Sequence, residues 1–481
     1  MPTATRPWLK AVAAAMAALS QAACAGNLAI EQTPETVRIL SGGKTVLCCV
    51  RKPSPFKPYV QELYTPSGFQ ILLDSPPDHK HHHGLMFAVN VGDTEFWGEE
   101  GTVGTQYVTK EEPPSQTIRN GRGEATLEQA LEWRDVSGIP LLTERRQITA
   151  HDTAADGLTL VTWRSTLSAP QGAAWAKIWG RHYFGLGMRF ASETYETGRF
   201  FNSASQEGEE IRGTERVARA QWCAFTAKPA GRPVTVAVFE HPGNPRVPTA
   251  FFTMTQPFCY MSATLNLYRQ RIVLNAGRAL DAAYGIALWD KEAGPEKIER
   301  ARRIWLEVSP PVGNSEVWET THVNIAAAEF GTKVDASSAY GPEYTAQKAI
   351  DGRWAARETD KWNSAAGITP HYLRFDFGRP RTVERIRIWH DGILPDGDAS
   401  TTRDFRIQRS DKPWGPWFDL CEPAVGNTAP VTEHIFPPAK TRYLRLLITT
   451  GEQNEANMFG RIFEVEVFSP RSAFETESEG R

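Results

Sequence analysis

Four of the chain's eleven histidines lie in one short segment, Asp78-His79-Lys80-His81-His82-His83-Gly84. No other stretch of the sequence is so dense in groups that transfer protons or bind metals. Imidazole titrates near neutral pH, so it can act as a general acid or base on a glycosidic or ring oxygen. In an extended segment His79, His81 and His83 would share one face and His82 would lie on the other. The segment is therefore the first candidate for a reaction centre.

Three interpretations of this histidine segment are open. The first is acid–base catalysis with a carboxylate partner, for which the candidates are Asp78, Glu99, Glu144, Glu207 and Glu240. A His–Glu pair suits epimerisation or mutarotation, whereas paired carboxylates suit glycoside hydrolysis. The second is a transition-metal site, because His-x-His on one face is a known ligand geometry for zinc and related ions. The third is structural, with the rings hydrogen-bonded around a turn.

Further candidates come from loops elsewhere in the same region. His241 and Asn244 follow an expected strand, in a Pro/Gly turn that could face the histidines. Lys177 and Arg181 belong to a basic segment that suits a uronate, sulfate or other anionic group, or is simply a solvated strand. The residues that we expect to act in catalysis are Asp78, His79, His81, His82, Glu99, Glu144 and His241. Those that we expect to contact substrate are His83, Trp97, Lys177, Arg181 and Asn244.

The elements that must position these residues are mostly short strands separated by turn residues. The segments Thr36–Leu40 and Lys44–Val50 flank Ser-Gly-Gly and predict a hairpin. Leu158–Leu167 and Val234–Phe239 predict further strands, and residues 295–307 predict a helix. The sequence therefore predicts an all-β protein in which a large β-sandwich precedes a second one.

Chain length and breaks rich in Pro, Gly and Ser predict the domain organisation. At about 150 residues per domain, 481 residues suggest two or three domains. We expect a β-sandwich domain over residues 30–308, a linker over 309–325, a second sandwich over 326–470 and a flexible tail over 471–481. A net charge of −3 gives no reason to expect nucleic acid as a partner. The cysteines are an odd, scattered set, typical of small buried hydrophobes, although a Cys223–Cys259 disulfide is conceivable.

The first 25 residues are typical of a secretory signal peptide. Arg6 and Lys10 precede a short apolar run, and Ala23-Cys24-Ala25 fits a small-x-small cleavage site. The run is shorter than the ~20 residues that span a bilayer, and no later segment has a membrane-span profile. We expect a periplasmic or secreted protein, with a lipoprotein anchored at Cys24 as the less favoured alternative.

Residues 330–468 contain an ordered series of motifs. They are Ala336-Ser337-Ser338, Ala349-Ile350-Asp351-Gly352, Leu373-Arg374-Phe375-Asp376-Phe377-Gly378, Arg442-Tyr443-Leu444-Arg445-Leu446 and Phe463-Glu464-Val465-Glu466-Val467. In these motifs the region resembles the discoidin, or coagulation factor V/VIII type C, family. That family shares its jelly-roll sandwich with galactose-binding-like carbohydrate-binding modules. The resemblance implies a glycan or oligosaccharide as partner.

The same resemblance implies two further features of the C-terminal domain. In many sugar-binding members a structural Ca2+ is held by carboxylates and carbonyls, and Asp351 and Glu464 occupy the matching positions. Asp351 could instead only cap its Asp-Gly turn. The family binds its ligands through loops at one end of the sandwich, where Trp354, His390, Asp391 and the loop 457–459 are the candidates.

The N-terminal region also contains motifs of a known family. They are Pro76-Pro77-Asp78-His79, Phe96-Trp97-Gly98-Glu99, Glu144-Arg145-Arg146, Gly185-Leu186-Gly187-Met188-Arg189 and His241-Pro242-Gly243-Asn244-Pro245. Residues 35–305 thereby resemble an exported family labelled methane oxygenase PmoA, but depart from it at Lys80 and His83. A particulate methane oxygenase subunit is an integral membrane protein, which this chain does not resemble. The resemblance implies instead an exported sandwich similar to galactose-mutarotase-like supersandwiches.

Two functions of different classes follow. The leading hypothesis is a secreted carbohydrate-active enzyme, glycoside hydrolase-like or epimerase-like, in which the discoidin-like module keeps the reaction centre close to glycan. The alternative is a non-catalytic glycan-binding or adhesion protein whose histidines are structural or bind a metal. A metal-dependent oxidoreductase, as the family label suggests, is a third and weaker possibility.

Overall fold

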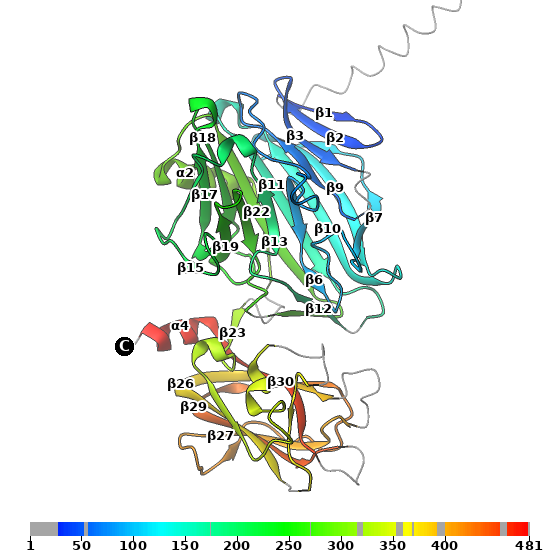
Figure 1. Cartoon of the computed structure of the whole chain (residues 1–481), viewed down its shortest axis with the longest axis vertical. Helices are drawn as coiled ribbons and strands as arrows, with labels where there is room; N and C mark the ends of the chain where they lie inside the picture. The colour runs from blue at the N-terminus through cyan, green and yellow to red at the C-terminus, as the bar shows by residue number, and fades with distance from the viewer. Residues whose placement is uncertain are drawn as a thin grey trace, which may run out of the picture. The chain divides into compact units, whose positions relative to one another are not determined.

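A computed structural model describes residues 27–51, 56–173, 175–269, 271–314, 321–352, 359–367, 370–391, 400–452 and 459–479. The chain divides into two compact units, Met1–Val317 and Trp318–Arg481 (Figure 1). Both are built almost wholly of β-strands, which confirms the all-β prediction. The predicted signal peptide and Trp354 lie outside the described residues. No helix in the described part of the chain is long and apolar enough to cross a membrane.

The first unit contains two large antiparallel sheets. The ten-stranded sheet has the order β1 (Leu28–Gln32), β2 (Thr36–Ser41), β3 (Lys44–Val50), β4 (Tyr59–Leu63), β5 (Leu85–Ala88), β13 (Gly185–Arg189), β20 (Tyr260–Thr264), β19 (Thr249–Met254), β16 (Arg216–Ala220) and β15 (Glu209–Glu210). The nine-stranded sheet has the order β14 (Arg199–Asn202), β17 (Trp222–Ala227), β18 (Val234–Glu240), β22 (Ala279–Trp289), β11 (Thr159–Ser168), β10 (Pro140–His151), β9 (Arg122–Arg134) and β7 (Thr105–Glu111), with β8 (Ser115–Arg119) paired to β9. A small third sheet joins β21 (Ile272–Asn275), β12 (Trp175–Trp179) and β6 (Asn90–Val91).

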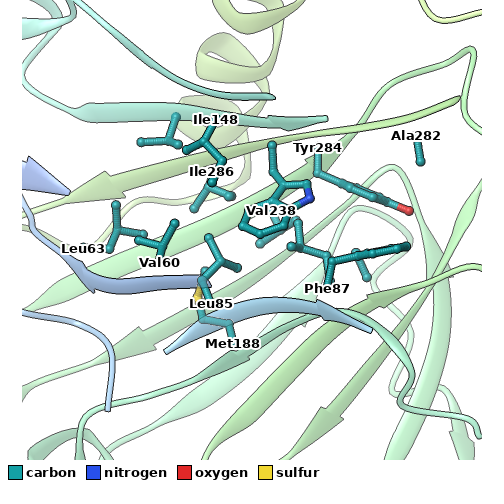
Figure 2. Close-up of a cluster of buried hydrophobic side chains, with 14 of the residues drawn as sticks. Val60, Leu63, Leu85, Phe87, Ile148, Met188, Val238, Ala282, Tyr284 and Ile286 are labelled. Atoms are coloured by element: carbon teal, nitrogen blue, oxygen red, sulfur yellow. The ribbon is translucent and has the colours of Figure 1, made fainter. Parts of the chain in front are cut away.

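The two large sheets pack face to face around one hydrophobic core. Figure 2 shows Val60 and Leu85 of the ten-stranded sheet opposite Val238 and Ile286 of the nine-stranded sheet. Successive strand residues point to opposite faces of a sheet. Apolar residues that alternate with the core residues therefore lie on the outer face of each sheet, where other elements must cover them. The predicted hairpin is present as β2 and β3, whose register runs from Thr36↔Val50 to Ser41↔Lys44.

Both outer faces of this sandwich are covered. On the nine-stranded sheet, the predicted helix is present as α2 (Pro295–Val308), which buries Ile298, Ala301 and Trp305 against β17, β18 and β22. On the ten-stranded sheet, loops cover a second apolar cluster built around Tyr59, Met86, Trp97, Phe184, Phe252, Phe258 and Tyr260. These loops include the histidine segment.

The second unit is a separate β-sandwich with its own core. Its strands are β23 (His322–Asn324), β30 (Arg461–Pro470), β26 (His371–His390), β29 (Val431–Thr450), β27 (Asp404–Ser410), β28 (Phe418–Asp419), β24 (Lys333–Ala336) and β25 (Trp362–Asn363). On β26, every second residue of the segment 373–377 is apolar, and these residues, Leu373, Phe375 and Phe377, are buried in this core.

The C-terminal tail differs from its prediction. Residues Arg471–Glu479 form the helix α4 instead of a frayed end. Phe474 packs against Phe330 with ring centroids 5.1 Å apart and lies under the Arg381 guanidinium. Thr382 donates its hydroxyl to Glu477 at 2.7 Å. These long-range contacts hold a segment whose own composition is polar.

The cysteines of the described residues are free thiols, so the conceivable Cys223–Cys259 disulfide is absent. Cys48, Cys49, Cys223 and Cys259 are buried, as expected of small hydrophobes.

Gly187 on β13 lets Tyr260 cross the outer face of the ten-stranded sheet. A Cβ at Gly187 would lie 1.9 Å from the Tyr260 hydroxyl oxygen and 3.1 Å from Trp97. Tyr260 is buried and has no room to retreat, so we expect Gly187→Ala to cost about 1–3 kcal/mol of unfolding free energy. Urea unfolding measures this cost.

A second substitution controls for the cause of that loss. The Tyr260 hydroxyl has no hydrogen-bond partner in the described structure, so Tyr260→Phe removes the closest atom at little cost. The double variant should recover part of the lost stability. If it is no more stable than Gly187→Ala alone, the steric explanation is wrong.

Candidate functional site

The histidine segment forms a compact turn in the loop between β4 and β5. The His82 N–H donates to the His79 carbonyl at 2.9 Å, and the Ser75 N–H donates to the His82 carbonyl at 3.0 Å. The segment is therefore not extended, and the arrangement of faces that an extended chain would give does not apply. Because the chain turns back, the His79 and His82 rings stack, with centroids 4.6 Å apart, instead of lying on opposite faces.

His83 is the most tightly held of the four rings. Its Nε2 lies 2.7 Å from Glu99 Oε1, and its Nδ1 lies 3.0 Å from Asp74 Oδ1. The ring stacks on Tyr59 at 3.9 Å, and the Tyr59 hydroxyl donates to Asp74 at 3.2 Å. Ionised carboxylates only accept hydrogen bonds, so both contacts are satisfied when each ring nitrogen carries a proton and the Ser75 hydroxyl, also 3.0 Å from Nδ1, donates to Asp74. His83 is therefore an imidazolium between two carboxylates.

A buried lysine completes this network. Lys57 is 1% exposed, and its Nζ lies 2.9 Å from both Glu99 Oε1 and the Trp97 carbonyl. Two cations, Lys57 and His83, thus balance two anions, Asp74 and Glu99. The balance matters because an unpaired buried charge is strongly destabilising.

The directions of the pKa shifts agree with this charge assignment. Burial alone would lower the pKa of His83, but the hydrogen bonds to Asp74 and Glu99 outweigh it and raise that pKa. Burial alone would raise the pKa of Asp74 and of Glu99, but their bonds to His83 bring both pKa values below the ordinary range. Burial lowers the pKa of Lys57, opposed by Glu99.

The outer part of the site is organised by Arg189 at the end of β13. Its guanidinium donates to Asp78 at 2.9 Å and to His82 Nδ1 at 3.2 Å, and it lies 3.4 Å above the Phe258 ring. Because Nδ1 accepts this bond, neutral His82 carries its proton on Nε2. Burial and the neighbouring imidazoles lower the pKa of His82 to about 2. Burial would raise the pKa of Asp78, but Arg189 and His79 together lower it to about 2.

The groups of the site that are at least partly open to solvent are His79, His81 and Asp78. The Asp78 side chain is 49% exposed and that of His79 is 37% exposed, and they contact each other at 3.1 Å. His81 is half-buried, and burial together with Lys57 lowers its pKa, so it is neutral near pH 7. A neutral imidazole beside an ionised carboxylate can accept or relay a proton from a bound ligand.

The floor of the site is aromatic. Trp97 stacks on Phe184 with centroids 4.7 Å apart and an interplanar angle of 5°. His82 contacts Trp97, Phe258 and Tyr260 edge-on or tilted, at 5.2–6.4 Å. Trp97 is 2% exposed, so it supports the histidines instead of offering an open stacking surface.

Of the predicted partners, only Glu99 and Asp78 contact the histidines. Glu144 lies in the sandwich core. Its carboxylate forms an ion pair with Arg146 at 2.7 Å and accepts a hydrogen bond from the Trp133 indole N–H at 2.9 Å. Its role as the acid–base partner is not supported by this position, because the core ion pair occupies its carboxylate. Glu240 is buried and accepts from the Thr249 N–H.

The other predicted residues of the first unit lie on different elements. His241 follows β18 of the nine-stranded sheet, accepts from the Gly243 N–H at 3.0 Å and packs on Trp305. The Asn244 amide bridges both backbone groups of Ala283 at 2.8 Å, a structural role. Lys177 lies on β12 of the small sheet, where burial and Arg271 lower its pKa to about 8. Arg181 is exposed, in the loop whose Tyr183 contacts Trp97 at 5.2 Å.

In the second unit, the predicted residues have mixed surroundings. Glu464 accepts from the Gly352 N–H at 3.1 Å, so it lies beside the Asp351-Gly352 turn, as the resemblance implies. His390 is fully buried, its Nε2 lies 3.0 Å from the Thr432 hydroxyl, and burial lowers its pKa to about 3. As placed, it cannot touch a ligand on a surface loop. Asp391 pairs with Lys361 at 2.7 Å.

The described residues include no group of three or more His, Cys, Asp or Glu arranged to hold a metal ion. At the histidine segment the reason is visible, because His83 uses both nitrogens on carboxylates and His82 accepts from Arg189. The segment does not fit a transition metal in this arrangement. At the Asp351-Gly352 turn the described residues supply two carboxylates, and calcium there stays a prediction.

Four residues of the site are absent from the sequence-based candidates. Asp74, which follows β4, and Arg189 on β13 contact the histidines directly, and Tyr59 at the start of β4 stacks on His83. Lys57, which precedes β4, is linked to His83 through Glu99. Asp74 offers a weak local signal, since it ends an apolar run just before Ser-Pro-Pro. Nothing near Lys57 marks it.

Comparison with known proteins gives two family matches. Residues 36–303 match a family of unknown function, DUF6807, and residues 333–465 match the F5/8 type C domain. The second match confirms the discoidin-type resemblance, whereas the methane oxygenase label finds no support in these matches. No curated protein matches the chain.

Several solved structures resemble part of the chain. A chitosan-binding module of a chitosanase/glucanase from Paenibacillus sp. IK-5 is 22% identical, with a TM-score of 0.25, over 31% of this chain and 99% of the module. The family 32 carbohydrate-binding module of Streptococcus pneumoniae EndoD is 23% identical, with a TM-score of 0.27, over 31% and 99%. That of C. perfringens NanJ, in complex with galactose, is 18% identical, with a TM-score of 0.25, over 31% and 98%. At these TM-scores the likeness supports no conclusion about the present chain.

The match to DUF6807 is the more extensive of the two family matches, because residues 36–303 make up more than half of the 481-residue chain. The protein therefore belongs to the DUF6807 family, and its second unit carries an F5/8 type C domain.

Proposed function

We propose that this protein is an exported carbohydrate-active enzyme. In this proposal the F5/8 type C domain binds glycan, and the loop between β4 and β5 performs acid–base chemistry on a sugar. The observation that carries the proposal is the imidazolium of His83 between Asp74 and Glu99, in the same turn as the mutually contacting rings of His79, His81 and His82. Ionisable groups with perturbed pKa values gather at functional sites more often than elsewhere.

The contacts assign different tasks to the inner and outer groups. Asp74 and Glu99 are both bonded to His83, so neither is free to act as one of the paired carboxylates of a glycosidase. His83, Lys57 and the two carboxylates position the loop. Proton transfer falls to half-buried His81 and to the more exposed His79–Asp78 pair, with the His82 Nε2–H as a further donor.

Glycan binding is proposed on the F5/8 type C match. Export is proposed on the charged and apolar pattern of residues 1–25. Keeping a weakly bound polymer close to the first unit raises its effective concentration there.

A paired variant tests the proposal. Wild type and His81→Ala/His82→Ala are incubated with glycans to which the full chain binds on a glycan array, and new reducing ends or epimers are measured. We expect the double variant to lose at least about a hundredfold in turnover, the usual contribution of a general acid–base group, and to keep its glycan affinity. Lys80→Ala, in the same turn, should retain turnover.

Two results would contradict the proposal. If wild type releases or converts nothing from any glycan that it binds, the first unit is not the enzyme proposed, and the protein is a glycan-binding one. If the double variant is as active as wild type, the chemistry lies elsewhere.

A further inference from the structure

A second candidate site lies on the opposite sheet of the first unit. The helix α2 lies beside β17 and β22 of the nine-stranded sheet (Figure 1). An open cavity of about 1000 Å3 is lined by residues of α2 together with Trp222 of β17 and Trp289 of β22. A volume of this size accommodates a ligand larger than a bare ion. The histidine loop belongs to the ten-stranded sheet, so the proposed acid–base site does not account for this cavity.

The cavity lining contains three carboxylates and three cations, but cations from outside the lining also contribute to its charge. Two of its carboxylates are neutralised from outside the lining, because Asp156 pairs with Arg122 at 2.7 Å and Glu299 pairs with Arg302 at 3.1 Å. Three lining cations, Lys297, Arg300 and Arg303, have no carboxylate within 4.0 Å among the described residues, and Glu296 is the one lining carboxylate left over. Counted with Arg122 and Arg302, the surroundings of the cavity therefore carry an excess of about two positive charges.

The indole N–H of Trp289, a buried donor in the cavity lining, also favours a negatively charged ligand. Trp289 is fully buried, and its indole N–H has no acceptor in the described structure. Its neighbour Trp222 donates the equivalent N–H to Glu299 at 3.2 Å. A buried donor without an acceptor is rare in proteins and calls for a partner. An acceptor-rich, negatively charged ligand would supply one.

The position of Lys297 also favours an anionic ligand. Its Nζ lies 5.9 Å from the centroid of the Trp289 ring, at the first turn of α2, where the helix N-terminus also favours anions. Burial and the adjacent Lys291 lower the pKa of Lys297 to about 8. Two neighbouring ammonium groups repel each other, and a bound anion relieves that repulsion.

We propose that this cavity binds an acidic saccharide, one that carries a carboxylate or a sulfate group. Lys297 and Arg300 would hold the anionic group, and the polar side chains of Ser203 and Gln221, which also line the cavity, would bond sugar hydroxyls. The choice of a saccharide rests on the proposed glycan binding, whereas the choice of an anion rests on the cavity alone.

Calorimetric titration of the full chain tests the proposal with four probes: trigalacturonate, a sulfated galactotriose, neutral galactotriose and citrate. We expect both acidic sugars to bind, and Lys297→Gln/Arg300→Gln to weaken them at least about tenfold, the loss of one charge-assisted hydrogen bond or more. Lys44→Gln/Arg232→Gln removes the same charge from exposed positions outside the lining and should change affinity less than about twofold.

Two further measurements, on the Trp289→Phe variant and with neutral galactotriose, distinguish a failure of this proposal from a failure of the proposed glycan binding. Trp289→Phe should weaken the acidic sugars without lowering unfolding free energy beyond the small loss of volume, because the deleted N–H has no acceptor. Neutral galactotriose reports glycan binding elsewhere, including the F5/8 type C domain, and should be unaffected by Lys297→Gln/Arg300→Gln. The proposal is overturned if wild type binds neither acidic sugar, if the double variant binds them as tightly, or if citrate binds as well as trigalacturonate.

Discussion

Arg146→Met is expected to lower the unfolding free energy of the first unit by about 3–5 kcal/mol, the usual loss when one partner of a buried ion pair is removed. Arg146 is 1% exposed and Glu144 is 2% exposed. The guanidinium binds Glu144 through two nitrogens, at 2.7 and 2.9 Å. Without it, the Glu144 carboxylate stays in the sandwich core with only the Trp133 and Ser165 donors.

The same guanidinium connects the core to the candidate site. Arg146 also donates to the Pro58 carbonyl at 2.9 Å and to Gln106 at 2.8 Å. Pro58 lies between Lys57 and Tyr59, which contact Glu99 and His83. Losing Arg146 should therefore also increase hydrogen exchange in the segment that leads into β4.

The neighbouring residue on β10 provides a matched control. Arg145 pairs with Glu128 at 2.6 Å, but its side chain is 64% exposed. Exposed ion pairs contribute about 0–1 kcal/mol, so Arg145→Met should change stability little. Urea unfolding followed by tryptophan fluorescence, with the transition of the first unit resolved, measures both variants. If the two lose the same stability, the buried pair has no special role.

Glu99→Gln is expected to lower the pKa of His83 and to change its protonation state near neutral pH. In wild type the carboxylates of Asp74 and Glu99 keep both ring nitrogens protonated. Glutamine keeps the shape of the side chain but removes the negative charge that favours the imidazolium. Ring 15N shifts of His83, followed by NMR from pH 5 to 9, report this state directly.

The same substitution has a pH-dependent effect on stability. The pKa of His83 is raised in the folded protein, so its contribution is complete below the ordinary imidazole value of about 6.5. That contribution is lost as the pH rises through the raised value. The part of the wild-type advantage over Glu99→Gln that comes from His83 should therefore shrink as the pH rises.

Glu100→Gln is the control for this experiment, because Glu100 is exposed and does not contact His83. It should leave the titration of His83 unchanged. A neutral His83 at pH 7 in wild type, or a titration that Glu99→Gln does not alter, would contradict the charge assignment.

The parts of the fold that are predictable from the sequence have local causes. The β2–β3 hairpin is set by its Ser-Gly-Gly turn, and the burial of Leu373, Phe375 and Phe377 follows from alternation along one strand. The helix α4 was not predictable, because the packing of Phe474 on Phe330 joins positions far apart in the chain.

The candidate site divides in the same way. The density of histidines in residues 79–83 is a local signal, and Glu99 follows close behind it. Asp74, Lys57 and Arg189 come together only because β4, β5 and β13 are neighbours in the ten-stranded sheet. Glu144 was predicted as a catalytic residue but is a core residue. A Glu and an Arg two residues apart on a strand share a face, and here that face points into the core.

The most direct test of the proposed chemistry is a crystal structure of the Glu99→Gln variant soaked with a glycan that the wild-type chain converts. We expect a sugar oxygen within hydrogen-bond distance of His81 or Asp78, above the stacked His79 and His82 rings. A sugar bound only by the F5/8 type C domain, with no sugar at the loop between β4 and β5, would contradict the account.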